Sequence, residues 1–80
     1  MTTDEIKKKT WEYIKAAVSD IDISAEYLKW YATIPPELQD FALDVFFIME
    51  ELAVNKITAE AAKMKYDNAI VQRIQCNNGV

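Results

Sequence analysis

An 80-residue chain with no histidine, one cysteine and a formal net charge of -4 has room for one domain and excludes a framework of intramolecular disulfide bonds. Its apolar fraction of 51% and aromatic fraction of 11% are typical of a folded globular protein, not of a disordered one. One glycine and two prolines leave little turn chemistry for β-hairpins. We therefore expect an all-α fold, a compact single-domain bundle of about four helices over residues 1–80.

The apolar periodicity places these helices at about residues 3–19, 25–33, 36–54 and 59–75. Thr2 and Glu5 have the spacing of a capping box, so the first helix should begin directly after Thr2. Ser24 is a favourable N-cap for the second helix, and Thr58 is one for the fourth. The third helix should begin at Pro36, because proline is well tolerated in the first turn of a helix.

The second helix is short and rich in aromatic residues. At about 100° per residue, Tyr27 and Tyr31 fall with Leu28 on the side expected to face inward, whereas Trp30 lies about opposite. An exposed tryptophan is a frequent hot spot of protein binding. Packing of Trp30 under the first helix is an equally good interpretation, so the pattern leaves both open.

The third helix, at about 36–54, is the most informative element because it is apolar on two opposite sides. One side carries seven apolar residues and is expected to face the core: Leu38, Phe41, Ala42, Val45, Ile48, Met49 and Leu52. Leu43, Phe47 and Val54 fall roughly opposite. A helix with two apolar sides either lies between neighbours in its own fold or buries the second side against another chain. We therefore expect this helix to be central, and the second side is either core or interface.

Acidic residues border this second apolar side. Residues 20–51 hold eight acids against Lys29 alone, a net charge of -7. Several of these acids form a narrow stripe between the two apolar sides of the third helix, which favours an interface with a polar rim. The predicted partner-binding residues are Trp30, Asp40, Leu43, Asp44, Phe47, Glu51 and Val54. Met64 and Val71 on the fourth helix add apolar surface, which favours a homodimer or a complex with another protein.

Catalytic and metal-binding signatures are missing from the sequence. A nucleophile needs a base within hydrogen-bond reach, and the usual base, histidine, is missing. Ser19 and Ser24 are explained as turn and cap residues. The run from Asp20 to Glu26 begins like a calcium loop, but it lacks the glycine and the closing glutamate that such a loop needs. We expect no enzyme, no cofactor and no metal site.

An alternative function is DNA binding. The segment 52–58, followed by an alanine-rich helix with Lys63, Lys65 and Arg73, loosely resembles the turn and second helix of a helix-turn-helix unit. The acidic net charge and the turn without glycine make nucleic acid a weaker choice of partner. Arg73, near the middle of the inward side of the fourth helix, is expected to reach an acid on a neighbouring helix.

The sequence also supports predictions of the protein's cellular location and of its function. The N-terminus has no apolar core of a signal peptide, and no apolar run approaches the roughly 18 residues of a membrane span. We expect a cytoplasmic protein. The predicted function is that of a small acidic regulator or inhibitor, similar in size and composition to phage or mobile-element accessory proteins. It would bind a protein with a basic surface, a second copy of itself, or both.

Overall fold

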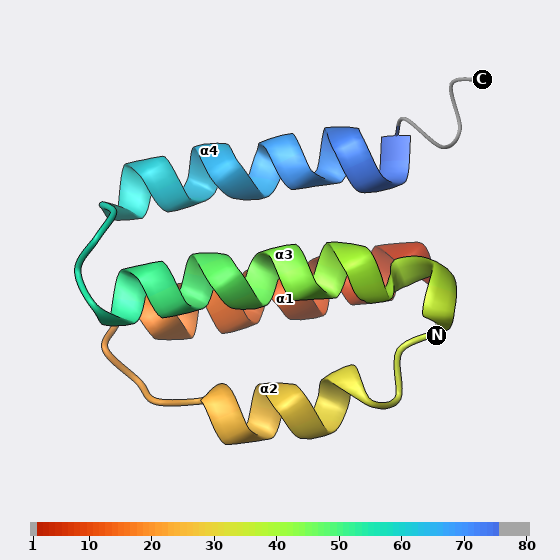
Figure 1. The fold of residues 1–80 in the computed structure, drawn as a ribbon, viewed down its shortest axis with the longest axis horizontal. Coiled ribbons are helices and arrows are strands. Elements are labelled where there is room, and N and C mark those ends of the chain that lie inside the picture. Colours follow the sequence, from red (N-terminus) through yellow and green to blue (C-terminus); the bar gives the residue numbers. More distant parts are fainter. Residues whose placement is uncertain (1, 76–80) are drawn as a thin grey trace.

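The chain forms four α-helices, which the computed structural model describes over residues 2–75. They are α1 (Thr3–Val18), α2 (Ser24–Tyr31), α3 (Pro36–Ala53) and α4 (Ala59–Ile70), and α4 continues into a π-helical segment, η1 (Val71–Gln75) (Figure 1). The predicted all-α class is therefore confirmed. Cys76 and the segment 77–79, where the sequence predicts that the fourth helix has ended, lie outside the described residues.

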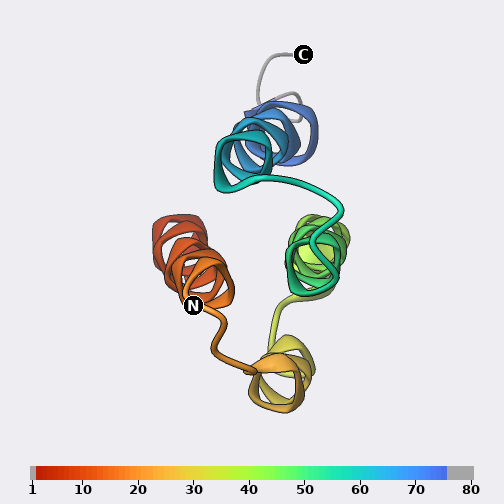
Figure 2. The same cartoon turned by 90° about the vertical axis from the view of Figure 1, so that its left-hand side faces the viewer.

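Helix α3 is the centre of the bundle, as predicted. An end view shows α1 and α3 side by side, α4 over one edge of this pair, and α2 beside α3 at the other edge (Figure 2). The molecule is flattened, with extents of 36 × 25 × 15 Å. In the part of the chain that is described, none of the helices combines the length and apolar character needed to cross a membrane. Since its three neighbours cover three sides of α3, the fourth side is open to solvent.

The core lies between α3 and its neighbours. On α3 the residues that face inward are Phe41, Ala42, Val45, Ile48, Met49 and Leu52, all buried, with Leu38 partly buried against them. This confirms the core side predicted for the helix. Residues of every other helix complete the core: Ile6, Ile14, Tyr27, Ala62, Tyr66 and Ala69. The hydrophobic effect of burying these side chains is the main force that holds the four helices together.

A small polar network ties α4 to α1. Thr10 is the one buried polar residue in residues 2–74. Its hydroxyl donates to the carbonyl oxygen of Lys7 at 2.9 Å, the Tyr66 hydroxyl donates to the same carbonyl, and the two hydroxyl oxygens are 2.8 Å apart. The ring of Tyr66 also packs on Trp11, with centroids 5.3 Å apart. Burial raises the pKa of Tyr66, so its hydroxyl keeps the proton that it donates.

Helix α2 docks through a different side from the one predicted. Tyr27 is buried, but Leu28 is exposed, so the inward position predicted for Leu28 was wrong. Trp30 is half-buried and its ring lies 5.6 Å from that of Tyr13 in α1, so of the two interpretations left open for Trp30 the structure shows packing against the first helix. The reason is an aromatic cluster: the Tyr27 ring contacts Tyr13 at 4.9 Å, Trp30 at 5.5 Å and Phe46 at 5.9 Å. Edge-to-face and stacked rings favour this rotation of α2 over the burial of Leu28.

Three of the four predicted helix starts are right, including the start of α3 at Pro36, and the start of α2 is wrong by one residue. The Thr2 hydroxyl accepts from the Glu5 amide, and the Thr58 hydroxyl accepts from the Ala61 amide, each at 3.1 Å. Ser24, by contrast, is the first residue of α2 and not its N-cap. The carboxylate of Asp22 accepts from the Ser24 amide at 3.3 Å, an Asx turn that replaces the expected cap.

Two helices end in the same backbone motif with an unusual residue. Asp20 after α1 and Asn55 after α3 have positive φ, 62° and 57°. In each motif the backbone amide of the following residue donates a hydrogen bond to a carbonyl in the last turn of the helix. The Ile21 amide donates to the carbonyl of Ala16, and the Lys56 amide donates to that of Glu51. This is the Schellman ending, whose left-handed position glycine occupies without steric cost.

We therefore predict that Asn55→Gly raises the free energy of unfolding by about 0.5 to 1 kcal/mol, because it relieves the left-handed strain of a residue with a Cβ. The same direction is expected for Asp20→Gly. Urea denaturation followed by circular dichroism measures the change. Asn68→Gly, in the middle of α4, is the matched control and should be destabilising. An Asn55→Gly variant that unfolds at lower urea than the wild type would contradict the strain argument.

Candidate protein-binding surface

The open side of α3 carries an apolar stripe. Leu43, Phe47 and Val54 are 38%, 53% and 65% exposed, so none of them belongs to the core of this chain. At about 100° per residue, they lie on the side of α3 that faces away from α1. We call these three residues the α3 stripe. Their exposure leaves large apolar side chains in water on the central helix of the fold, where burial would be favourable.

The acids beside the α3 stripe form ion pairs with α4. The Nε of Arg73 donates to Asp44 Oδ2 at 2.9 Å, and its Nη1 lies 4.0 Å from Asp40. Lys65 Nζ donates to both carboxylate oxygens of Glu51, at 3.0 and 3.1 Å. The hydrogen bond to Asp44 and its charge raise the pKa of Arg73. Two of the predicted rim residues, Asp44 and Glu51, thus also hold α4 against α3, and the predicted ion pair of Arg73 is confirmed.

The π-helical segment η1 explains where Arg73 lies. In a regular helix Arg73 would continue the inward side formed by Ala62, Tyr66 and Ala69. The wider turn of η1, with hydrogen bonds to the fifth residue along, brings Ile74 into the buried position, and Arg73 is exposed at the edge facing α3. The expected place of Arg73 in the middle of the inward side was wrong for this reason.

A hollow of about 240 Å³ lies between α3 and α4, directly beside the stripe. Phe47 forms one wall, the buried Ile48 and Ala69 form the floor, and the exposed Asn68 and Gln72 form the other wall. The pair Asp44–Arg73 lies at one end and the pair Glu51–Lys65 at the other. We call this hollow the α3–α4 notch. Sequence reasoning missed Asn68, Ala69 and Gln72, because small and amide side chains on a helix carry no chemical signal of binding.

The apolar surface continues over α4. Met64 and Val71 are exposed, and they line a shallow hollow together with Lys65, Asp67 and Asn68. Since Lys65 and Asn68 also line the notch, the stripe, the notch and the outer side of α4 form one continuous surface. Trp30 is not part of it: its ring packs on Tyr13 and Tyr27 on the other side of the bundle.

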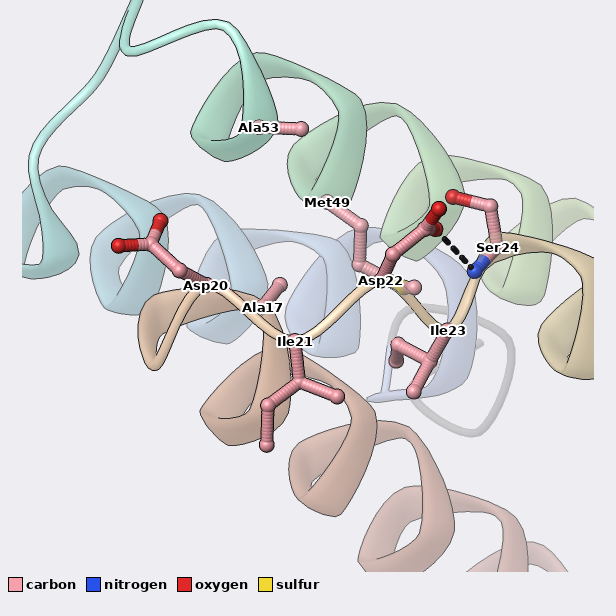
Figure 3. Close-up of a pocket in the computed structure, with 8 residues that line it drawn as sticks. All are labelled: Ala17, Asp20, Ile21, Asp22, Ile23, Ser24, Met49 and Ala53. Carbon is pink, nitrogen blue, oxygen red and sulfur yellow. Dashed lines mark hydrogen bonds between the residues drawn. The ribbon is translucent and has the colours of Figure 1, made fainter.

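A second hollow, of about 220 Å³, lies at the end of the bundle between the α1–α2 loop and α3. In Figure 3 the side chain of Met49 points from α3 toward this loop, and the carboxylate of Asp22 turns to the backbone amide of Ser24. Asp20 also lines the hollow. Across residues 2–75, however, no three His, Cys, Asp or Glu side chains converge where they could hold a metal ion. The loop-end hollow is a small recess lined both by apolar side chains, such as Ile21 and Met49, and by the carboxylates of Asp20 and Asp22.

The basic residues of α4 all contact side chains of their own fold. Lys63 pairs with Asp67 at 3.2 Å and lies over the ring of Trp11 at 6.0 Å. Lys65 pairs with Glu51, and Arg73 with Asp44. Phosphate binding needs several cations free on one surface, whereas these three are each engaged with a carboxylate. Their arrangement stabilises the fold rather than presenting a basic face.

No protein-family model matches this chain, and neither the curated proteins nor the solved structures include a match to it.

Proposed function

We propose that this chain is a small protein-binding module, a regulator or inhibitor, that docks on a different protein through the α3 stripe. One observation carries the proposal: Phe47 is 53% exposed on the uncovered side of the helix that all the others pack against. Fully burying a Leu, Val or Phe side chain is favourable by about 1.5 to 3 kcal/mol. The stripe therefore holds apolar surface that folding leaves unused and that a partner can bury.

The charges around the stripe bear on whether the partner is a different protein or a second copy of this chain. Five carboxylates of α3 lie around the stripe against two cations, Lys65 and Arg73, a net charge of -3: Glu37, Asp40, Asp44, Glu50 and Glu51. A twofold dimer brings the same patch of both copies together, so it would set these acids against each other. A basic surface would instead be attracted, which speeds association. These charges favour a basic partner over a homodimer.

The alternative of DNA binding through α4 has less support. It requires Lys63, Lys65 and Arg73 to leave Asp67, Glu51 and Asp44 before they can reach phosphate groups. Exposed ion pairs of this kind are weak, about 0 to 1 kcal/mol each, but the carboxylates stay beside the cations and repel the DNA backbone. We therefore favour protein binding.

Site-specific photocrosslinking tests the proposal. A photoreactive phenylalanine analogue is placed at Phe47, and in a control at Glu12, an exposed residue of α1. Both variants are irradiated in cells of the organism that encodes the chain, and the adducts are identified by mass spectrometry. We expect one defined protein, with a basic surface, attached at position 47 and not at position 12. An adduct with a second copy of the chain, with DNA, or of equal yield at both positions would contradict the proposal.

A further inference from the structure

We infer that the α3–α4 notch is an anchor site for one large apolar side chain, presented by an amphipathic helix whose flanks carry lysine or arginine. The inference rests on the proposed function and adds what the partner must look like. It depends on the shape of the notch, on the spacing of the α3 stripe and on the carboxylates that remain available around it. Each of these can be derived from the contacts described above.

The ends of the notch limit what it can hold. Asp44 and Glu51 are seven residues apart on α3, a separation of about 10 Å along the helix axis, and both are fixed by cations of α4. The floor is apolar, with Ile48 and Ala69 buried beneath it. The hollow is open to solvent and its volume is about 240 Å³, so it has room for a single large side chain over the apolar floor. An extended peptide that bound by strand addition would need an exposed strand edge, and residues 2–75 contain no strand.

The residues of the α3 stripe are spaced at intervals that a second helix can match. Leu43 lies one turn before Phe47 and Val54 lies two turns after it, about 6 and 10 Å along the axis. An amphipathic helix presents its apolar anchors at four- and seven-residue intervals. A partner helix along α3 can therefore place one anchor in the notch beside Phe47 and further apolar residues on Leu43 and Val54. The apolar residues of the partner helix would then lie at the same intervals as those of the α3 stripe.

Two carboxylates near the stripe remain available for a partner. Within the described residues, the side-chain carboxylates of Glu37 and Glu50 form no hydrogen bond or ion pair. Asp40, with 78% of its side chain exposed, meets Arg73 only at 4.0 Å. Lysine or arginine on the flanks of the partner helix would meet these acids at the solvent-exposed rim, where charge steers association. Asn68 and Gln72, on the far wall of the notch, offer amide donors and acceptors.

Peptide selection against the full-length chain tests the inference. A display library of helical peptides of about 15 residues, near the length at which isolated helices begin to be stable, is randomised on one face. The selected peptides are then measured against three variants. Asn68→Trp fills the notch from its exposed wall, Phe47→Asp disrupts the stripe, and Glu60→Trp is the matched control on exposed α4 surface outside the notch.

We expect winners with one large apolar residue flanked by lysine or arginine on the same face. Their affinity should fall about tenfold or more for Asn68→Trp, or about 1.4 kcal/mol, and stay unchanged for Glu60→Trp. Selected peptides that lose affinity for Phe47→Asp but not for Asn68→Trp would contradict the notch as the anchor site and would still support the stripe as the binding surface. Winners that are insensitive to both, or no winner, would overturn both the notch and the proposed function.

Discussion

Replacing Phe41 by alanine is expected to lower the free energy of unfolding by about 3 to 5 kcal/mol, whereas Phe47→Ala should lower it by less than about 1 kcal/mol. The two residues have the same type and lie on the same helix, but Phe41 is 1% exposed and Phe47 is 53% exposed. The Phe41 ring packs on Tyr66, with centroids 5.9 Å apart, so its removal leaves a cavity between α3 and α4. Phe47 contacts Phe46, with ring centroids 6.5 Å apart, but its removal leaves a space that is open to solvent rather than a buried cavity.

Urea denaturation of the two variants measures this difference. Alanine increases the helix propensity of both positions equally, so that contribution cancels in the comparison. A domain of this kind is stable by about 5 to 15 kcal/mol, so Phe41→Ala should remove a large part of its stability. Equal losses for Phe41→Ala and Phe47→Ala would show that Phe47 serves the fold, and the α3 stripe would then be core surface.

Tyr27→Ala is expected to cost a comparable amount, about 3 to 5 kcal/mol. Tyr27 is fully buried, its ring joins α2 to Tyr13 of α1 and to Phe46 of α3, and its hydroxyl donates to the carbonyl of Ala42 at 2.6 Å. Burial raises the pKa of Tyr27, which keeps this donor protonated. Tyr27→Phe, which keeps the ring and loses the hydrogen bond, should cost about 1 to 2 kcal/mol.

Amide hydrogen exchange shows which helix Tyr27→Ala destabilises, as well as how large the loss of stability is. Helix α2 has eight residues, too few for an isolated helix to be stable in water, so it depends on the packing of Tyr27. In Tyr27→Ala the amides of α2 should exchange first, before those of α1 and α3. If Tyr27→Phe is as destabilising as Tyr27→Ala, the hydrogen bond and not the aromatic cluster holds α2.

The helix bounds could be predicted from sequence because their causes are local. The expected ends at 19, 33, 54 and 75 compare with observed ends at 18, 31 and 53 and with a helix that continues as η1 to residue 75. Threonine caps and a proline in the first turn act within a few residues of themselves. The rotation of α2 could not be predicted, because it depends on rings of Tyr13 and Phe46 that lie in other helices.

The candidate surface was only partly predictable for the same physical reason. The exposure of Leu43 and Phe47 follows from the two-sided pattern of α3, once the other helices are placed on its three remaining sides. The ion pairs of Asp44 and Glu51 depend on the rotation of α4 and η1 against α3. That rotation is set by Tyr66 and Ile74 in the core, not by any local signal near the acids.

The most direct test of the binding surface is the affinity of the crosslinked partner for three forms of the purified chain. Leu28→Asp is the matched control, because Leu28 on α2 is 51% exposed and Phe47 is 53% exposed. We predict that Phe47→Asp weakens binding by at least about 100-fold, the loss typical of a hot-spot residue, while its unfolding free energy stays near the wild-type value. Leu28→Asp should bind like the wild type. Equal affinity of the wild type and Phe47→Asp for the partner would contradict the assignment of the α3 stripe as the binding surface.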